Sequence, residues 1–192
     1  MIRDQLTYGL GRLAAVARQR DWKSGEELGL TPTQGDVLRM LSGRLFGLRL
    51  NELAGQLSVR PSTASDAVSA LFTKGWVVKE ADPDSSRAIR IRLSQEGSML
   101  LGQMPDGHSH VVALLSDAEV ESMHAIVIGA IGRLQKSGQI APQRICVTCK
   151  YFLPDARLDK AHSNFCVLIG QALEIADLRV DCAEHEEKHS ST

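Results

Sequence analysis

The apolar positions in the first part of the chain recur with a helical period. In residues 3–20 apolar residues fall on one side of such a helix and arginines on the other, which predicts an amphipathic helix. The Gly-containing segment KSGEELGLTP is expected to end it. The apolar positions of this helix are Leu6, Leu10, Leu13, Ala14 and Ala17. A second helix, QGDVLRMLSG, is predicted to follow, with Thr33 as its N-cap.

From Leu50 the pattern indicates two helices and then two strands. LNELAGQL predicts a short helix capped by Asn51, and SVR predicts a tight turn. Pro61 suits the first position of the next helix, which Gly75 ends. WVVKEA and AIRIRL then favour two strands around the turn DPDSS. We therefore expect a helix pair followed by a basic hairpin.

Two further helices are expected after the hairpin. SQEGSMLLGQM forms the first, and SDAEVESMHAIVIGAIGRLQKSG forms a longer one that opens with a capping box of Ser116 and Glu119. The apolar stripe of the longer helix could fill a core or, with the first helix of the chain, form a dimer interface. KSGQIAPQR is the best linker candidate, so we predict domains at residues 1–139 and 140–192. The fold class is mainly α with a small β-hairpin.

Composition and charge limit the class of protein. The chain has 192 residues, 43% hydrophobic and 23% charged, with a formal net charge of −1, which argues against wholesale coating of nucleic acid. Residues 44–97 nevertheless carry eight Lys or Arg against six Asp or Glu, a weak basic patch. Neither a signal-peptide core nor a run of ~20 apolar residues is present. We expect a soluble cytoplasmic protein without a membrane partner.

Residues 30–135 resemble the MarR family of bacterial transcriptional regulators. The resemblance rests on LTPTQGDVLRML, on LNELAGQLSVRPSTASDAVSALFTKGWVVKEADPDSSRAIRIRLSQEG, and on the helices that flank them. It implies a winged helix-turn-helix with a helical dimerisation region, and a homodimer that reads a pseudo-palindromic operator in double-stranded DNA. The wing of this family usually has an Asp-x-Arg pattern before its second strand. Here DPDSSRAIRI keeps Arg87 and shifts the aspartate.

The helix after the turn is expected to enter the major groove, with its N-terminal residues toward the base edges. Hydroxyl groups can bind phosphate or base, a carboxylate can accept from a cytosine amino group, and cations suit phosphate. The DNA-binding candidates on and beside this helix are Arg60, Ser62, Thr63, Ser65, Asp66, Ser69 and Lys74. On the hairpin they are Arg87, Arg90 and Arg92.

All four cysteines lie in the last 47 residues, after 145 residues without one. They are Cys146, Cys149, Cys166 and Cys182. In a reducing compartment such a cluster indicates metal or redox chemistry more often than disulfides. Zinc would take Cys146, Cys149, Cys182 and either Cys166 or His185, whereas an iron–sulfur cluster would take the four cysteines. Free or disulfide-exchanging thiols are the third interpretation.

The text around these ligands, CVTCKYF and NFCVLIG, resembles the high-potential iron–sulfur proteins. The resemblance implies a [4Fe-4S] cubane on the four cysteines, with Gly170 in the turn after the third ligand. It implies an apolar wall of Tyr151, Phe152, Phe165, Leu168 and Ile169.

These observations together predict a DNA-binding regulator, in particular a repressor. Its cysteine segment would sense redox state, oxygen, nitric oxide or iron. The alternatives are a MarR-type regulator with a structural zinc site in its tail and, with less support, an iron–sulfur electron-transfer protein. We find no Ser-His-Asp arrangement, phosphate loop or paired-carboxylate site in a recognisable context, so we do not expect an enzyme.

Overall fold

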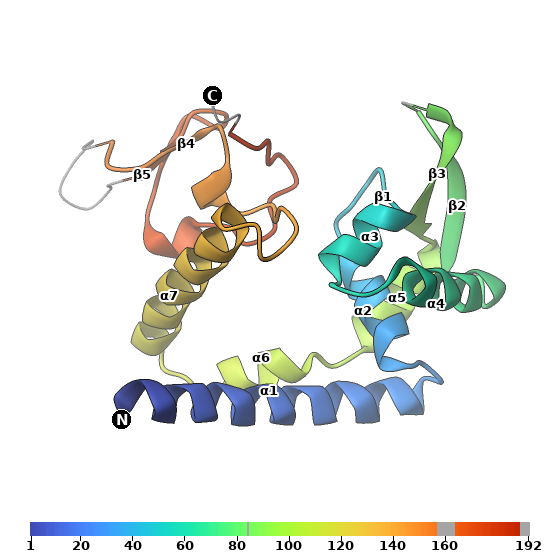
Figure 1. Ribbon diagram of the computed structural model, residues 1–192, viewed down its shortest axis with the longest axis horizontal. Helices are drawn as coiled ribbons and strands as arrows, with labels where there is room; N and C mark the ends of the chain where they lie inside the picture. The colour runs from blue at the N-terminus through green and yellow to red at the C-terminus, as the bar shows by residue number, and fades with distance from the viewer. Residues whose placement is uncertain (84, 157–163, 189–192) are drawn as a thin grey trace. The chain divides into compact units, whose positions relative to one another are not determined.

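A computed structural model describes residues 1–83, 85–156 and 164–188 (Figure 1). The chain divides into two compact units, Met1–Leu115 and Ser116–Thr192, here called the N-terminal and C-terminal units. The boundary expected near residue 139 falls inside the C-terminal unit. The long helix before it packs against the elements of the cysteine segment, so the two form one compact unit.

The N-terminal unit is mainly helical. Its helices are α1 (Ile2–Glu27), α2 (Pro32–Leu41), α3 (Leu50–Gln56), α4 (Pro61–Thr73), α5 (Gln95–Gln103) and α6 (Gly107–Val112). The predicted Thr33 cap of α2 is wrong. Thr31 is the N-cap, because Pro32 takes the first helical position and the side chains of Thr31 and Gln34 each accept from the other's backbone N–H. The Asn51 cap is wrong as well, since α3 begins at Leu50 and Arg49 is its N-cap, two residues before the predicted one.

Helix α1 extends past the predicted end at residue 20 and continues to Glu27. Gly25 is tolerated inside it because the chain folds back there: Leu30 N donates to the Gly25 carbonyl over 2.7 Å. Close packing also joins α6 to this helix. A Cβ on Gly107 would lie 2.1 Å from the Ala17 carbonyl oxygen, so only glycine allows the two backbones to come this near.

A three-stranded antiparallel sheet completes the N-terminal unit. Its strands are β1 (Leu48–Arg49), β2 (Val77–Asp82) and β3 (Ser85–Leu93), in the order β1-β3-β2. The predicted hairpin of β2 and β3 is confirmed. Strand β1 was not predicted, because two residues are too few to display an alternating pattern. The winged helix-turn-helix is thus formed by α3, α4 and this sheet (Figure 1).

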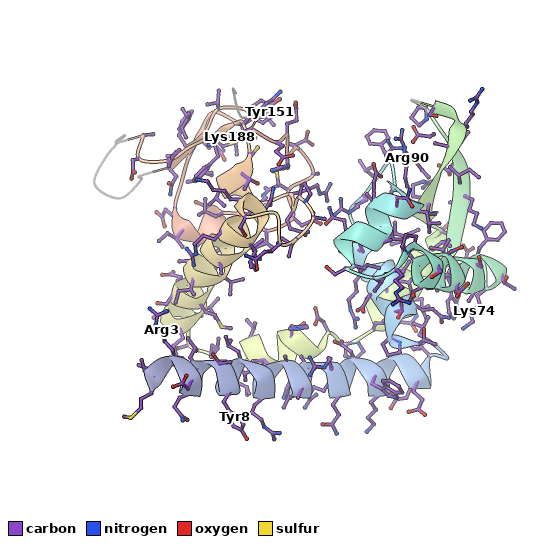
Figure 2. The ribbon with its side chains drawn as sticks, viewed as in Figure 1. Arg3, Tyr8, Lys74, Arg90, Tyr151 and Lys188 are labelled. Carbon is purple, nitrogen blue, oxygen red and sulfur yellow. The ribbon has the colours of Figure 1, made fainter. Side chains whose placement is uncertain are left out.

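One aliphatic core holds the winged helix together. It joins residues from α2, α3, α4, β1, β2, β3 and α5. Its large, fully buried side chains are Val37, Leu38, Leu41, Leu53, Leu71 and Val77. By contrast, the expected apolar face of α1 is largely exposed: Leu6 is 62% and Leu10 is 52% accessible in the single chain. Tyr8, which also belongs to α1, points away from α6 (Figure 2).

The C-terminal unit begins with α7 (Asp117–Lys136), whose capping box of Ser116 and Glu119 is confirmed. Its other elements are η1 (Cys146–Thr148), β4 (Phe152–Leu153), β5 (Asn164–Cys166), β6 (Gln171–Leu173) and η2 (Ile175–Asp177). The strands pair antiparallel in the order β4-β5-β6. Within the described residues, no helix combines the length and apolar character that a membrane span needs.

Candidate DNA-binding face and cysteine site

Helix α4 presents two different faces. Its buried side is apolar and packs into the core of the N-terminal unit through Ala64, Ala67, Val68 and Leu71. Its opposite side carries the predicted DNA-binding candidates: Ser62, Thr63, Asp66 and Ser69 are exposed and Ser65 is half-buried. The structure therefore brings the small polar side chains together on one accessible face, near the N-terminus of the helix.

The two flanking cations of α4 lie in different surroundings. Arg60 is the exposed N-cap residue, beside the polar face. Lys74 follows the last helical residue, and its Nζ donates to the Gly29 carbonyl over 2.6 Å and lies 4.8 Å from the Trp76 ring centre (Figure 2). Lys74 is thus held by its own unit at the end of α4 opposite Arg60.

The three predicted hairpin arginines are likewise not equivalent. Arg87 is exposed in β3 near the tip of the hairpin. Arg92 forms an ion pair with Glu80 across the strands, which lowers the pKa of Glu80 and raises that of Arg92. The Arg90 side chain is 19% exposed, and its Nε lies 3.0 Å from Asp82 Oδ2. Of these three arginines, Arg87 is therefore the one that is exposed, whereas Arg90 and Arg92 are half-buried.

Two charged residues of this sheet were missed by sequence reasoning. Asp82, whose side chain is completely buried, binds the guanidinium of Arg49 as well as that of Arg90. Arg49 lies in β1, which has no detectable pattern, so its approach to the hairpin had no signal in the sequence. The buried aspartate in the turn text DPDSS was the one available hint.

All four cysteines line one cavity of about 70 Å³ in the C-terminal unit. Cys146 begins η1, Cys149 follows it, Cys166 ends β5, and Cys182 comes after η2. The apolar residues that line the cavity with them are Tyr151, Phe152, Leu168, Ile169 and Leu173. Of the predicted wall, Phe165 is not among the lining residues. Gly170 has φ +64° in the turn after the third cysteine, as predicted.

Backbone hydrogen bonds tie the two ends of the segment together at this cavity. Cys146 N donates to the Arg179 carbonyl over 3.0 Å, and Arg179 N donates to Cys146 Sγ over 3.1 Å. Cys182 N donates to the Arg144 carbonyl over 2.9 Å, and the side chains of Arg144 and Asp181 form an ion pair at 2.6 Å. The first and last cysteines are thus positioned by the same pair of chain segments.

The electrostatics of the cavity suit a cationic centre. Burial raises the pKa of the Cys146 thiol, the Arg179 N–H opposes this, and the neighbouring thiols of Cys182, Cys149 and Cys166 raise the pKa further. All four are free thiols. Because metal binding replaces the thiol proton and neutralises the charge of clustered thiolates, a metal centre would relieve the smaller part of this rise, which comes from the neighbouring thiols.

The spacing of the sulfurs bears on which centre fits. Four thiolates around one zinc ion, at Zn–S of about 2.3 Å, would lie about 4 Å apart. A cubane binds each thiolate at a different iron corner, so its cysteine sulfurs lie farther apart than those around a single metal ion. Within the described ranges, no three Cys, His, Asp or Glu ligand atoms of the C-terminal unit lie within 4.8 Å of one another. The cysteine sulfurs of the described residues are therefore not already gathered at the spacing of a zinc site.

The predicted alternative ligand His185 is engaged elsewhere. Its Nε2 lies 3.1 Å from Thr148 Oγ1, and burial lowers its pKa. The nearby Tyr151 hydroxyl donates to Glu186, which also pairs with Lys150 and raises the pKa of that lysine (Figure 2). These contacts attach the last described residues to Thr148 of η1 and to Lys150 and Tyr151 after it.

Helix α7 contacts the cysteine segment at two places. His124 Nε2 lies 2.7 Å from the Leu178 carbonyl, close to η2. Three turns later, Gln135 accepts from Gln143 N over 3.0 Å, and its amide donates to Thr148 Oγ1 over 3.4 Å. Between these points Ile128 and Ile145 share the core of the C-terminal unit. Both chain segments that carry the first and last cysteines are therefore attached to this helix.

Comparison with known proteins agrees with the helix-turn-helix and its hairpin. Residues 30–89 match the model of the MarR family, whose members are DNA-binding transcriptional regulators and not enzymes. This agrees with the expectation that the chain has no enzymatic activity. A search of curated proteins found no matching sequence.

Several solved structures share the fold. A Mycobacterium tuberculosis MarR family protein, Rv2887, in complex with salicylic acid is 28% identical with a TM-score of 0.50, over 64% of this chain and 93% of that one. CouR from Rhodococcus jostii RHA1, bound to p-coumaroyl-CoA, is 21% identical with a TM-score of 0.57, over 66% and 92%. MepR from S. aureus, in a complex with DNA, is 23% identical with a TM-score of 0.55, over 67% and 97%.

Proposed function

We infer that this chain is a MarR-type transcriptional regulator, and we propose that its four cysteines bind an iron–sulfur cluster whose state controls DNA binding. The observation that carries the proposal is the cavity lined by all four cysteines, in a unit whose core includes the long helix α7. In this proposal the winged helix binds DNA, and the cysteine site senses the signal.

The DNA-binding part of the proposal rests on α4 and the hairpin tip. The accessible polar face of α4 suits the major groove, and Arg87 suits the minor groove or the backbone beside it. A homodimer would present two such faces to a pseudo-palindromic operator, with half-sites about one helical turn apart. The exposed leucines of α1 are a surface of the N-terminal unit that a second copy would cover, and exposed apolar residues of α7 such as Ile126 offer a separate one on the C-terminal unit.

An iron–sulfur cluster is favoured over zinc by the residues around the sulfurs. Cys146, Cys149, Cys166 and Cys182 line a cavity with aromatic and aliphatic side chains, and an apolar shell of this kind controls the redox potential and solvent access of metal sites. When bound, a cluster would supply reversible one-electron chemistry and reactivity toward oxygen or nitric oxide. The chain's own part is to hold four thiolates apart and to donate the Arg179 N–H to Cys146 Sγ, a contact that tunes such centres.

The route from cluster to DNA runs through α7 in this proposal. Loss of the cluster would release the η1 turn and the segment before Cys182 from each other. Both are attached to α7, through Gln135 and His124 respectively. If α7 forms part of the dimer interface, its displacement changes the spacing of the two reading heads. A coupling of about 1–3 kcal/mol between the sites would change DNA affinity by about 5- to 150-fold.

A structural zinc site remains the second candidate. It is favoured by the turn in which His185 N donates to the Cys182 carbonyl over 3.2 Å, since Cys-x2-His is a common zinc half-site. In that case the metal would stabilise the C-terminal unit without reporting a signal.

The test is a DNA-binding titration of one anaerobic preparation, divided into cluster-loaded and cluster-free samples. The probe is a fluorescent duplex from the region upstream of the chain's own gene. We expect the two samples to differ in affinity by at least about fivefold, and we expect Arg87→Ala to weaken both. Equal affinities would reject cluster control, and unchanged, salt-insensitive binding by Arg87→Ala would reject the role of the hairpin.

A further inference from the structure

The wing sheet contains a buried charge cluster that the proposed function does not use. Arg49 and Arg90 are direct cross-strand partners in β1 and β3. Like charges at opposite positions repel each other and destabilise a pair of strands. The Asp82 carboxylate, fully buried at the end of β2, binds both guanidinium groups and offsets that repulsion. We call Arg49, Asp82 and Arg90 the wing triad.

The backbone directs Asp82 to this position. The register of β2 against β3 shifts between Ala81 and Asp82, so that Asp82 pairs with Ser85. Such irregularities in an antiparallel pair re-aim a side chain and increase the local twist. The shift falls immediately before the buried aspartate, at the base of the hairpin tip that leads to Arg87.

The wing triad also joins the hairpin to the helix-turn-helix. Arg49 is the N-cap residue of α3, and its backbone N–H donates to Glu52 over 2.8 Å. Arg90 lies three residues after Arg87 in β3 (Figure 2). The carboxylate of Asp82 therefore links the start of the first helix of the motif to the strand that carries the exposed arginine.

We propose that Asp82 is the positioning residue of the DNA-binding wing. It would hold the hairpin at a fixed angle to α3 and α4, so that Arg87 and the polar face of α4 reach DNA at the same time. This inference rests on the proposed DNA-binding function and adds to it the residue that sets wing geometry. Asp82 would act through the two arginines, without touching DNA.

The direction in which DNA affinity changes when Asp82 loses its charge distinguishes a positioning role from a purely electrostatic one. Asp82→Asn removes one negative charge beside a DNA-binding face, which by charge alone strengthens binding to phosphate. Positioning predicts the opposite, because two adjacent guanidinium groups without a shared carboxylate separate and the wing loses its orientation. Glu80→Gln is the matched control: it removes the same charge from the same strand, but Glu80 is exposed and pairs with Arg92.

The experiment compares the full-length wild type, Asp82→Asn and Glu80→Gln in titrations of the upstream duplex at several salt concentrations. We expect Asp82→Asn to bind about tenfold more weakly, and the slope of log affinity against log salt to decrease by about one. Glu80→Gln should bind as tightly as wild type or slightly more tightly. A loss of stability alone would lower the competent fraction without changing the salt slope.

Arg90→Lys provides a second variant should Asp82→Asn fail to fold. It keeps the charge but loses the forked guanidinium geometry, so it too should bind more weakly while melting as a folded protein. Wild-type affinity and salt slope in the folded variants would overturn the positioning role and leave the proposed function intact. Absence of DNA binding by the wild type and Glu80→Gln alike would overturn the proposed function, and the inference with it.

Discussion

The two units of this chain are stabilised in different ways. The N-terminal unit buries a continuous set of aliphatic side chains, including Leu38, Leu53 and Leu71, contributed by several helices and a sheet. The core of the C-terminal unit is smaller and includes a cysteine: Ile128, Ile145, Cys149, Phe152, Leu173 and Leu178. Its strands are two or three residues long.

This difference indicates which unit needs a metal centre for its stability. An aliphatic core on the scale of the N-terminal unit stabilises a fold without further help, whereas short strands with few buried side chains usually need a cross-link or a metal. Four free thiols around one cavity are available for that purpose. We therefore expect the C-terminal unit to depend on its bound centre and the N-terminal unit to be independent of it.

The largest effect should come from removal of one ligand. Cys149→Ser is expected to destabilise the C-terminal unit by on the order of 5 kcal/mol, because the free energy of metal binding is also free energy of folding. Hydrogen exchange followed by mass spectrometry should show lost protection in α7 and the cysteine segment. Protection in α2 and α4 should stay at the wild-type level. Equal loss in both units would contradict their independence.

The reverse perturbation is a cavity in the other core. Leu38 is completely buried, so Leu38→Ala should destabilise the N-terminal unit by about 2–5 kcal/mol. The iron, sulfide and zinc content of the protein should remain at the wild-type value. Loss of the bound centre in this variant would show that the two units fold as one.

A smaller effect is expected at the contact between α7 and the cysteine segment. His124→Leu removes the partner of the Leu178 carbonyl, which should cost about 1–3 kcal/mol. We expect the bound centre to be retained, while the difference in DNA affinity between cluster-loaded and cluster-free protein shrinks. An undiminished difference would exclude this contact from the route of coupling.

The smallest effect concerns the turn of the helix-turn-helix. Ser58 has φ 54°, in the left-handed region that a side chain disfavours. Ser58→Gly removes that strain but adds freedom to the unfolded chain, so a net stabilisation of at most about 1 kcal/mol is expected. A thermal melt of the N-terminal transition measures it, and a decrease in stability would show that the serine side chain contributes to the turn.

Sequence patterns predicted the helix-turn-helix and hairpin because their periodic apolar positions are the same ones that fill the core. Leu53, Val68 and Ile91 occupy periodic apolar positions in these segments and are buried. Ile89 lies two positions before Ile91 in the alternating pattern of β3, yet it is 56% exposed, because it lies toward the hairpin tip and beyond the core. Periodicity indicates a face of an element but not how far the core extends beneath it.

The sites were harder to predict because they depend on contacts between distant residues. The gathering of the four cysteines followed from their spacing, and the structure brings all of them to one cavity. The contacts of the wing triad could not be predicted from spacing. Arg49 and Asp82 are 33 positions apart, and they meet only because β1 pairs with β3. Likewise, the sequence indicated a cation at Lys74 but not its attachment to the Gly29 carbonyl.

The nature of the bound centre is the most direct test of the central claim. Protein purified without oxygen should be analysed for iron, acid-labile sulfide and zinc, with Cys182→Ser prepared in parallel. We predict a brown protein with about four iron and four sulfide per chain, and a large loss of both in the variant. A colourless wild-type protein with about one zinc per chain would contradict the proposal of a cluster and identify the site as a structural zinc site.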